Sequence, residues 1–196
     1  MSAESTKKQQ THKRILDAAS QGFRRYGYSG VGVDGIAKAA GVTSGAFYSH
    51  LGSKDKAFSA ALDAGLNEVI EAIPKIQREA ERSWVKAFVD YYLGPAHRKD
   101  LACGCAMTTL SPEVVRAGPE LHAAYETKMN EIVELVANGF EGGSQNERLA
   151  RAWAMIGVLI GGLTMVRAMQ TEETAEKIAA SISNTAVSVA NGQHSV

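Results

Sequence analysis

The residues with the clearest capacity for chemistry lie in a short stretch near residue 45. Four of them, Thr43, Ser44, Tyr48 and Ser49, carry hydroxyl groups, and His50 adds an imidazole ring. Few of these side chains need burial, and all of them can donate or accept hydrogen bonds. A helix of this kind is typical of one inserted into the major groove of DNA. The face expected to be presented consists of Ser44, Gly45, Ala46, Tyr48, Ser49 and His50.

The residues before this stretch predict the element that positions it. Ile36, Ala37 and Ala40 recur at helical spacing, and Gly41 supplies the permissive backbone of a sharp turn. Thr43 or Ser44 can then cap a second helix by accepting a bond from its free amides. We therefore expect two short helices joined by a glycine turn. The alternative is a small helical corner inside an ordinary all-α domain.

Two longer helices should flank this unit. Residues 11–26 place Ile15, Leu16, Ala19, Phe23 and Tyr26 on one face, and Gly27 should end that helix. A further helix should begin near Ser53 or Lys54 and run to Ile73, where Pro74 interrupts or bends it.

The rest of the chain predicts helices only. No alternating strand pattern lasts more than a few residues, and glycine–proline pairs divide the sequence. The expected helices are 75–94, 101–110, 119–140, 146–169 and 172–190. The predicted fold is all-α, with a flexible basic arm over residues 1–10. A three-helix helix-turn-helix DNA-binding domain should follow over 11–56, and a helical ligand-binding and dimerisation bundle over 57–196.

Charge is distributed unevenly along a chain of zero net charge. Residues 1–60 hold nine Lys or Arg against four acids, whereas the remainder holds twelve against seventeen. A basic head on an acidic body indicates that the head alone meets a polyanion.

Composition also bears on location and on metal chemistry. The first ten residues lack an apolar stretch, and the most apolar window, Ala152 to Val166, is shorter than about 18 residues. Cys103 and Cys105 are too close together to staple a fold, and no further Cys or His cluster completes a zinc site. We expect a cytoplasmic protein with no membrane span, no metal and no cofactor. No motif of a catalytic nucleophile, phosphate loop or metalloprotease is present, so we expect no enzyme.

The helix expected over residues 149–169 is apolar nearly all round and contains Gly157, Gly161 and Gly162. A helix that is apolar on every side must be buried on every side. We therefore expect helices 146–169 and 172–190 to form a homodimer interface with a second copy. The alternative is a central core helix within one monomer.

With these residues in view, the chain resembles the TetR family of transcriptional regulators over about residues 11–60. The matching parts are Ile15-Leu16-x-Ala18-Ala19, Phe23-x-x-x-Gly27-Tyr28, Ile36-Ala37-x-x-Ala40-Gly41-Val42, Gly45-x-x-Tyr48-x-His50 and Lys54. The resemblance implies a homodimer that binds a double-stranded DNA operator. It also implies release from the operator when a small-molecule effector binds the helical body.

The resemblance assigns roles within the head. Tyr48, His50 and Lys54 would contact phosphates, and Gly45 would let the backbone approach the DNA, while Ser44 and Ala46 are candidates for reading bases. A packing role for Tyr48 remains open. Gly32 departs from the pattern, because the family usually has Ser or Thr there, and Leu51 replaces the usual Phe.

In the body, the sequence predicts an apolar effector pocket. Its candidate lining residues are Phe88, Tyr92, Cys105, Met107, Tyr125, Met129 and Trp153. The Gly104-Cys105 pair resembles a subgroup of the family in which some members sense electrophiles or oxidants. Cys105 is therefore either a redox sensor or a small buried residue.

Overall fold

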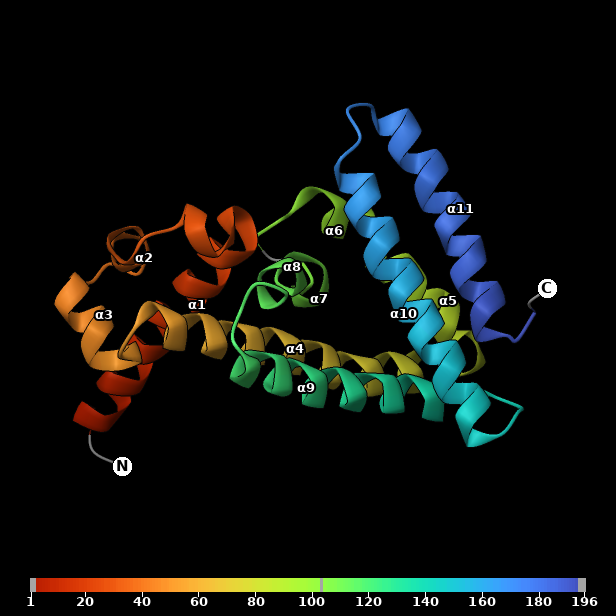
Figure 1. Cartoon of the computed structure of the whole chain (residues 1–196), viewed down its shortest axis with the longest axis horizontal. Coiled ribbons are helices and arrows are strands. Elements are labelled where there is room, and N and C mark those ends of the chain that lie inside the picture. Colours follow the sequence, from red (N-terminus) through yellow and green to blue (C-terminus); the bar gives the residue numbers. More distant parts are fainter. Residues whose placement is uncertain (1–2, 103, 194–196) are drawn as a thin grey trace. The chain divides into compact units, whose positions relative to one another are not determined.

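The computed structural model describes residues 3–102 and 104–193, and in these ranges it contains helices and no strand (Figure 1). The predicted all-α fold is confirmed. The helices are α1 (Ala3–Gly30), α2 (Val33–Ala39), α3 (Ser44–Leu51), α4 (Lys54–Ala80), η1 (Glu81–Ser83), α5 (Trp84–Tyr92), α6 (Pro95–Lys99), α7 (Ala106–Thr109), α8 (Ser111–Val114), α9 (Pro119–Asn138), α10 (Gln145–Arg167) and α11 (Glu172–Ala190).

The helices fall into two compact units. The first contains residues up to Gly65 together with Leu101–Tyr125, and the second contains Leu66–Asp100 and the residues from Glu126 onward. Helices α4 and α9 each contribute to both units. The expected functional domains 11–56 and 57–196 remain a prediction.

The core of the first unit is aromatic where α1, α3 and α4 meet. Phe23 and Phe47 are fully buried, and Phe58 is 4% exposed. The rings of Phe23 and Phe58 meet edge to face at 5.2 Å, a favoured aromatic geometry. The predicted core face of the first helix is confirmed at Ile15 and Ala19, which are fully buried.

Helix α1 differs from the expected helix at both ends. It begins at Ala3, because the segment predicted as a flexible arm consists mainly of good helix formers, so the helix extends through it. Gly27 is non-helical, with φ 72° and ψ 174°, as the expected break requires, but helical turns resume and extend to Gly30. Tyr26 lies 59% exposed, so its expected place on the buried face is wrong.

Helix α4 also differs from the prediction, since it passes through Pro74 and ends at Ala80. A proline removes one backbone hydrogen bond, and the adjacent Ile73 is fully buried, so packing holds the helix together across that position. The single helix expected over 75–94 is instead the end of α4, the short η1 and α5.

The segments around the remaining prolines are shorter than expected. The helix predicted over 101–110 is reduced to α7, and Ser111-Pro112 opens the separate helix α8. Pro95 begins α6, a five-residue helix that the sequence analysis did not predict. Proline suits the first turn of a helix because its missing N–H has no intrahelical partner there.

In the second unit, α10 and α11 lie side by side and antiparallel (Figure 1). Their close approach depends on Gly162, because a Cβ at this position would lie 2.4 Å from Cγ2 of Ile182. Helix α5 packs against both. The Trp84 indole of α5 donates a hydrogen bond to the carbonyl of Gly139 at 3.0 Å.

The opposite face of α10 is uncovered within the chain. Trp153 is 45% and Met165 52% exposed, and a Cβ at Gly157 or Gly161 would meet no atom within 4 Å. A single chain therefore does not bury α10 on every side, which counts against the alternative of a central core helix, and burial by a second copy remains a prediction. Within the chain, α10 packs against α5, α6 and α11.

By length and composition, α10 could also cross a membrane. Its most apolar 18-residue window has a mean hydropathy of 1.7, and 39% of that window is buried within the chain. The apolar window is thus longer than the sequence analysis allowed. A long apolar helix that packs in the core of a soluble protein gives the same signal.

Candidate nucleic-acid interface

Helices α2 and α3 form the predicted unit around a glycine turn. Gly41 has φ +65°, and the N–H of Val42 donates back to the carbonyl of Ala37 at 2.9 Å. A residue in the left-handed conformation, followed by a backbone hydrogen bond to the last turn, is a common way for a helix to end. Ile36 and Ala37 are buried, which anchors α2 against α1.

Thr43 is the residue that caps α3. Its Oγ1 accepts a hydrogen bond from the N–H of Ala46 at 3.2 Å. The sequence left open whether Thr43 or Ser44 would do so, and the structure assigns the cap to Thr43. Capping by a threonine contributes about 1 kcal/mol to helix stability.

Helix α3 buries only one narrow stripe. Phe47 and Leu51 are buried, Tyr48 is 52% exposed, and Gly45 and Ser49 are exposed. These three exposed positions are among those predicted to face DNA. Ala46 and His50 are half-buried, and the His50 ring lies 5.9 Å from that of His12 on α1.

Ser44 makes a contact that the sequence analysis missed. Its Oγ donates a hydrogen bond to Oδ1 of Asp34 on α2 at 2.5 Å. The bond ties the first turn of α3 to the first turn of α2. The hydroxyl oxygen of Ser44 keeps its lone pairs, so it can still accept a bond from a base or from water.

Gly32 is the N-cap of α2 and makes no side-chain capping bond. Its φ of −94° is open to any residue, and a Cβ there would meet no atom within 4 Å. The glycine is therefore not required by the backbone. The departure from the family pattern removes a hydroxyl without a steric reason.

The start of α4 is organised around Tyr28. Ser53 caps the helix by accepting the N–H of Lys56 at 3.1 Å, as predicted. The Tyr28 hydroxyl donates a hydrogen bond to Asp55, and the ammonium group of Lys54 lies 4.3 Å from the centre of the Tyr28 ring. Lys54 is thus held by a cation–π contact at the place where a phosphate contact is proposed.

The environment of Tyr28 raises its pKa from 10.0 to about 12. The hydrogen bond to Asp55 is the largest cause, followed by burial and by the negative charge of Asp55. Tyr28 therefore stays protonated and remains a donor over the whole physiological range. No local sequence pattern indicates this pair, because Tyr28 and Asp55 lie 27 residues apart.

The expected pocket residues are mostly buried but belong to different units. Phe88, Tyr92 and Met129 lie in the second unit and are 2–3% exposed, while Met107 lies in the first and is fully buried. Trp153 does not fit the expectation, because it lies on the uncovered face of α10. A common pocket for these side chains remains a prediction.

Cys105 is 8% exposed and stands at the N-cap of the four-residue helix α7. Tyr125, in the same unit, is half-buried, its hydroxyl lies 2.7 Å from that of Ser111, and burial is the main cause that raises its pKa. Cys103 lies outside the described residues. No group of three or more His, Cys, Asp or Glu suited to a metal occurs among the residues that the structure describes.

Comparison with known proteins agrees with this geometry. Residues 15–61 match the family model described as bacterial regulatory proteins, tetR family. The HTH-type transcriptional repressor NemR of Escherichia coli strain K12 is 21% identical over 184 residues. That alignment covers 89% of this chain and 92% of the relative.

Solved structures extend the likeness to the whole fold. The reduced form of E. coli NemR has a TM-score of 0.71 at 19% identity, covering 89% of this chain and 96% of that one. A TetR-family transcriptional regulator from Streptomyces coelicolor has a TM-score of 0.74 at 20% identity, covering 94% and 96%. FadR of Bacillus subtilis, solved in complex with stearoyl-CoA, has a TM-score of 0.68 at 15% identity, covering 93% and 99%. Residues 15–61 thus match the bacterial regulatory proteins of the tetR family, and the chain as a whole shares the fold of solved TetR-family regulators.

Proposed function

We propose that this chain is a ligand-responsive repressor that binds a double-stranded DNA operator as a homodimer. The observation that carries the proposal is α3, a capped helix with an exposed polar face on a matched TetR-type head. In this role the exposed side chains of α3 enter the major groove of the DNA, and the N-terminus of α4 contacts the DNA phosphate backbone. We propose no catalytic role, and we propose that the protein acts in the cytoplasm.

The proposed DNA contacts lie on the exposed and half-buried face of α3, with its N-cap, and at the start of α4. Tyr48 and His50 bond phosphates, Lys54 pairs with another, and Gly45 allows close approach of the backbone. The base-reading residues are Ala46, with its methyl group, and Ser44, whose free lone pairs accept. Thr43 and Ser49 complete the interface at its edges.

The proposed dimer uses the uncovered face of α10 with α11 beside it. Exposed Trp153 and Met165 flank Gly157 and Gly161, which leave room for a helix from a second copy to lie close. Two-fold pairing would bury these residues and would space two α3 helices for a palindromic operator.

The proposed effector is a small apolar molecule held in the helical body. Its support is the number of buried aromatic and methionine side chains there, including Phe88, Tyr92 and Met129. FadR, a relative by fold, was solved with stearoyl-CoA, a ligand with a long apolar chain. Binding would favour a body conformation whose dimer no longer fits the operator.

The test is selection of binding sites from random duplex DNA, followed by titration of the selected site. The expected product is a sequence with two-fold symmetry, bound by the wild type and lost in Tyr48→Ala. Lys75→Ala is the matched control, because its ammonium is exposed on the second unit and should leave binding unchanged. Selection of no sequence, or unchanged binding by Tyr48→Ala, would contradict the proposal.

A second candidate is an electrophile- or oxidant-responsive repressor acting through Cys105. The observation that favours it is the likeness to NemR, whose solved structure is described as the reduced form. Against it stands the burial of Cys105. Mass spectrometry after mild quinone or peroxide treatment tests the idea. Unmodified Cys105 in a protein that still releases DNA with another ligand would exclude it.

A further inference from the structure

A cleft of about 790 Å³ lies in the first unit, and none of the apolar pocket residues named above belongs to its lining. Its lining comes from the end of α1, the start of α4, and the segment from α8 to the first turn of α9. Its volume falls in the range of small-molecule sites. The lining is Tyr28, Ser29, Asp55, Lys56, Phe58, Ser59, Glu113, Arg116, Ala117, Gly118, Pro119, Glu120 and Leu121.

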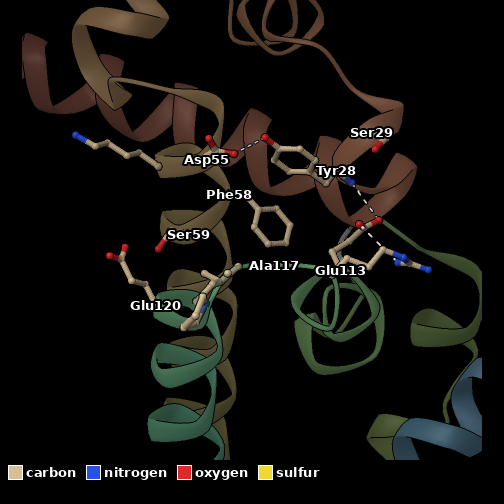
Figure 2. A pocket seen from close by; sticks show the side chains of 13 residues that line it. Tyr28, Ser29, Asp55, Phe58, Ser59, Glu113, Ala117 and Glu120 are labelled. Atoms are coloured by element: carbon tan, nitrogen blue, oxygen red, sulfur yellow. Dashed lines mark hydrogen bonds and ion pairs between the residues drawn. The ribbon is translucent and has the colours of Figure 1, made fainter.

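The cleft has an aromatic and aliphatic interior. The rings of Tyr28 and Phe58 meet edge to face at 5.5 Å, and in Figure 2 Phe58 lies between Tyr28 and Ala117. Pro119 and Leu121 add aliphatic surface at the start of α9. An occupant therefore needs an apolar body.

The charged groups of the cleft favour a cation. Asp55, Glu113 and Glu120 supply three carboxylates against two basic side chains. Arg116 donates to the carbonyl of Pro112 at 2.7 Å and pairs with Glu113, so this pair carries no net charge. The remaining groups, Asp55 and Glu120 against Lys56, leave the lining with one net negative charge.

The Tyr28 ring already contacts a cation, and the carboxylates of Asp55 and Glu113 already accept hydrogen bonds. Lys54 lies over the Tyr28 ring, which shows that this ring accepts a cation on its face. Glu113 accepts the N–H of Tyr28 at 3.3 Å, and Asp55 accepts its hydroxyl (Figure 2). Each carboxylate has about four lone-pair sites, so both can accept from a ligand as well.

We propose that this cleft binds an amphipathic organic cation, with its charge at Asp55, Glu113 and Glu120 and its apolar part against Phe58, Pro119 and Leu121. A small anion would meet a lining with one net negative charge and is disfavoured for that reason. A ligand here would touch the residues that hold Tyr28 and the first turn of α4. Its effect on DNA release rests on the proposed function, whereas its binding does not.

The test is calorimetric titration of the full chain, without DNA, with tetraphenylphosphonium and with tetraphenylborate. These two ions have nearly the same size and shape and opposite charge. We expect the phosphonium to bind at one site per chain and the borate to bind at least about tenfold more weakly. Equal affinity for both ions, or no binding of the phosphonium, would overturn the proposal.

Two substitutions locate the site. Glu113→Gln keeps an oxygen that can accept the N–H of Tyr28 but removes the charge, and Glu120→Gln removes an exposed charge. Each should weaken phosphonium binding about three- to tenfold, and the double substitution should weaken it further. Glu134→Gln on α9, an exposed acid of the second unit, is the control and should change nothing. Unchanged affinity in the folded double variant, checked by circular dichroism, would also overturn the proposal.

Discussion

At the scale of single residues, Gly32 is the clearest departure from the pattern of the head. The helix it caps has a free N-terminus, the backbone there tolerates any side chain, and space is available for one. Serine at this position would bond the free amides of the first turn. The same hydroxyl would lie where a phosphate contact is expected in this family.

Gly32→Ser should therefore stabilise the protein by a few tenths of a kcal/mol, the difference between these two residues as N-caps. It should also tighten operator binding, because one more donor reaches the DNA backbone. Thermal unfolding and operator titration measure the two effects. Gly41→Ser is the contrasting variant, since φ +65° is strained for serine and the variant should lose stability. Weaker operator binding by a stable Gly32→Ser would contradict the assigned geometry of α2.

Tyr28 gives a prediction about pH. Its pKa is raised in the folded state to about 12, above the value of 10.0 in an unfolded chain. The folded state then holds the proton more tightly, so this contribution to stability is complete below about pH 10. It is lost as the pH rises from about 10 through about 12.

Chemical denaturation at pH 9 and pH 11.5 tests this effect against Tyr28→Phe. The wild type should lose more stability between the two pH values than the phenylalanine variant, which has no proton to release. Titration of lysines is common to both proteins and cancels in the comparison. An equal loss in the two proteins would show that the bond to Asp55 does not shift the pKa of Tyr28.

At the scale of elements, Gly162 fixes how closely α10 and α11 pack. A Cβ at this position would lie 2.4 Å from one carbon of Ile182 and 2.9 Å from another. Gly162→Ala should therefore destabilise the protein by about 1–3 kcal/mol, as overpacking of a core does. Gly35→Ala is the matched control, because its Cβ would meet only Val31 at 3.7 Å.

The control should gain about 0.5–1 kcal/mol, since alanine favours a helix more than glycine does. Urea denaturation of both variants measures the difference in the free energy of unfolding. If Gly162→Ala were as stable as Gly35→Ala, the packing of α10 against α11 would have to be looser than the structure shows.

Comparison of the predicted helices with the observed ones shows which elements the sequence alone could predict. The unit of α2 and α3 was predictable because its buried positions, glycine turn and cap are all local signals. The path of α4 through Pro74 was not, because the burial of Ile73 that sustains it comes from tertiary packing. The bonds from Ser44 to Asp34 and from Tyr28 to Asp55 and Glu113 were equally hidden, since they join segments brought together only by the fold.

At the scale of the whole molecule, the uncovered face of α10 determines the state of assembly. Trp153→Glu places a charge among residues that the proposed dimer buries, and an unpaired buried charge is costly. The variant should be monomeric by analytical ultracentrifugation and should bind a palindromic operator far more weakly. Glu131→Gln on an exposed face of α9 should remain dimeric. A dimeric Trp153→Glu would move the interface away from this face.

The central claim is that α3 binds in the major groove of DNA and that residues of α3 and the start of α4 contact its phosphates. The most direct test is operator affinity as a function of salt concentration, for the wild type and for Lys54→Ala. Phosphate contacts release counterions, so affinity should fall steeply with salt, by about 0.9 in logarithmic slope for each contact. Lys54→Ala in a dimer should reduce that slope by about 2, one contact for each protomer. A slope near zero, or a slope unchanged by Lys54→Ala, would contradict this account.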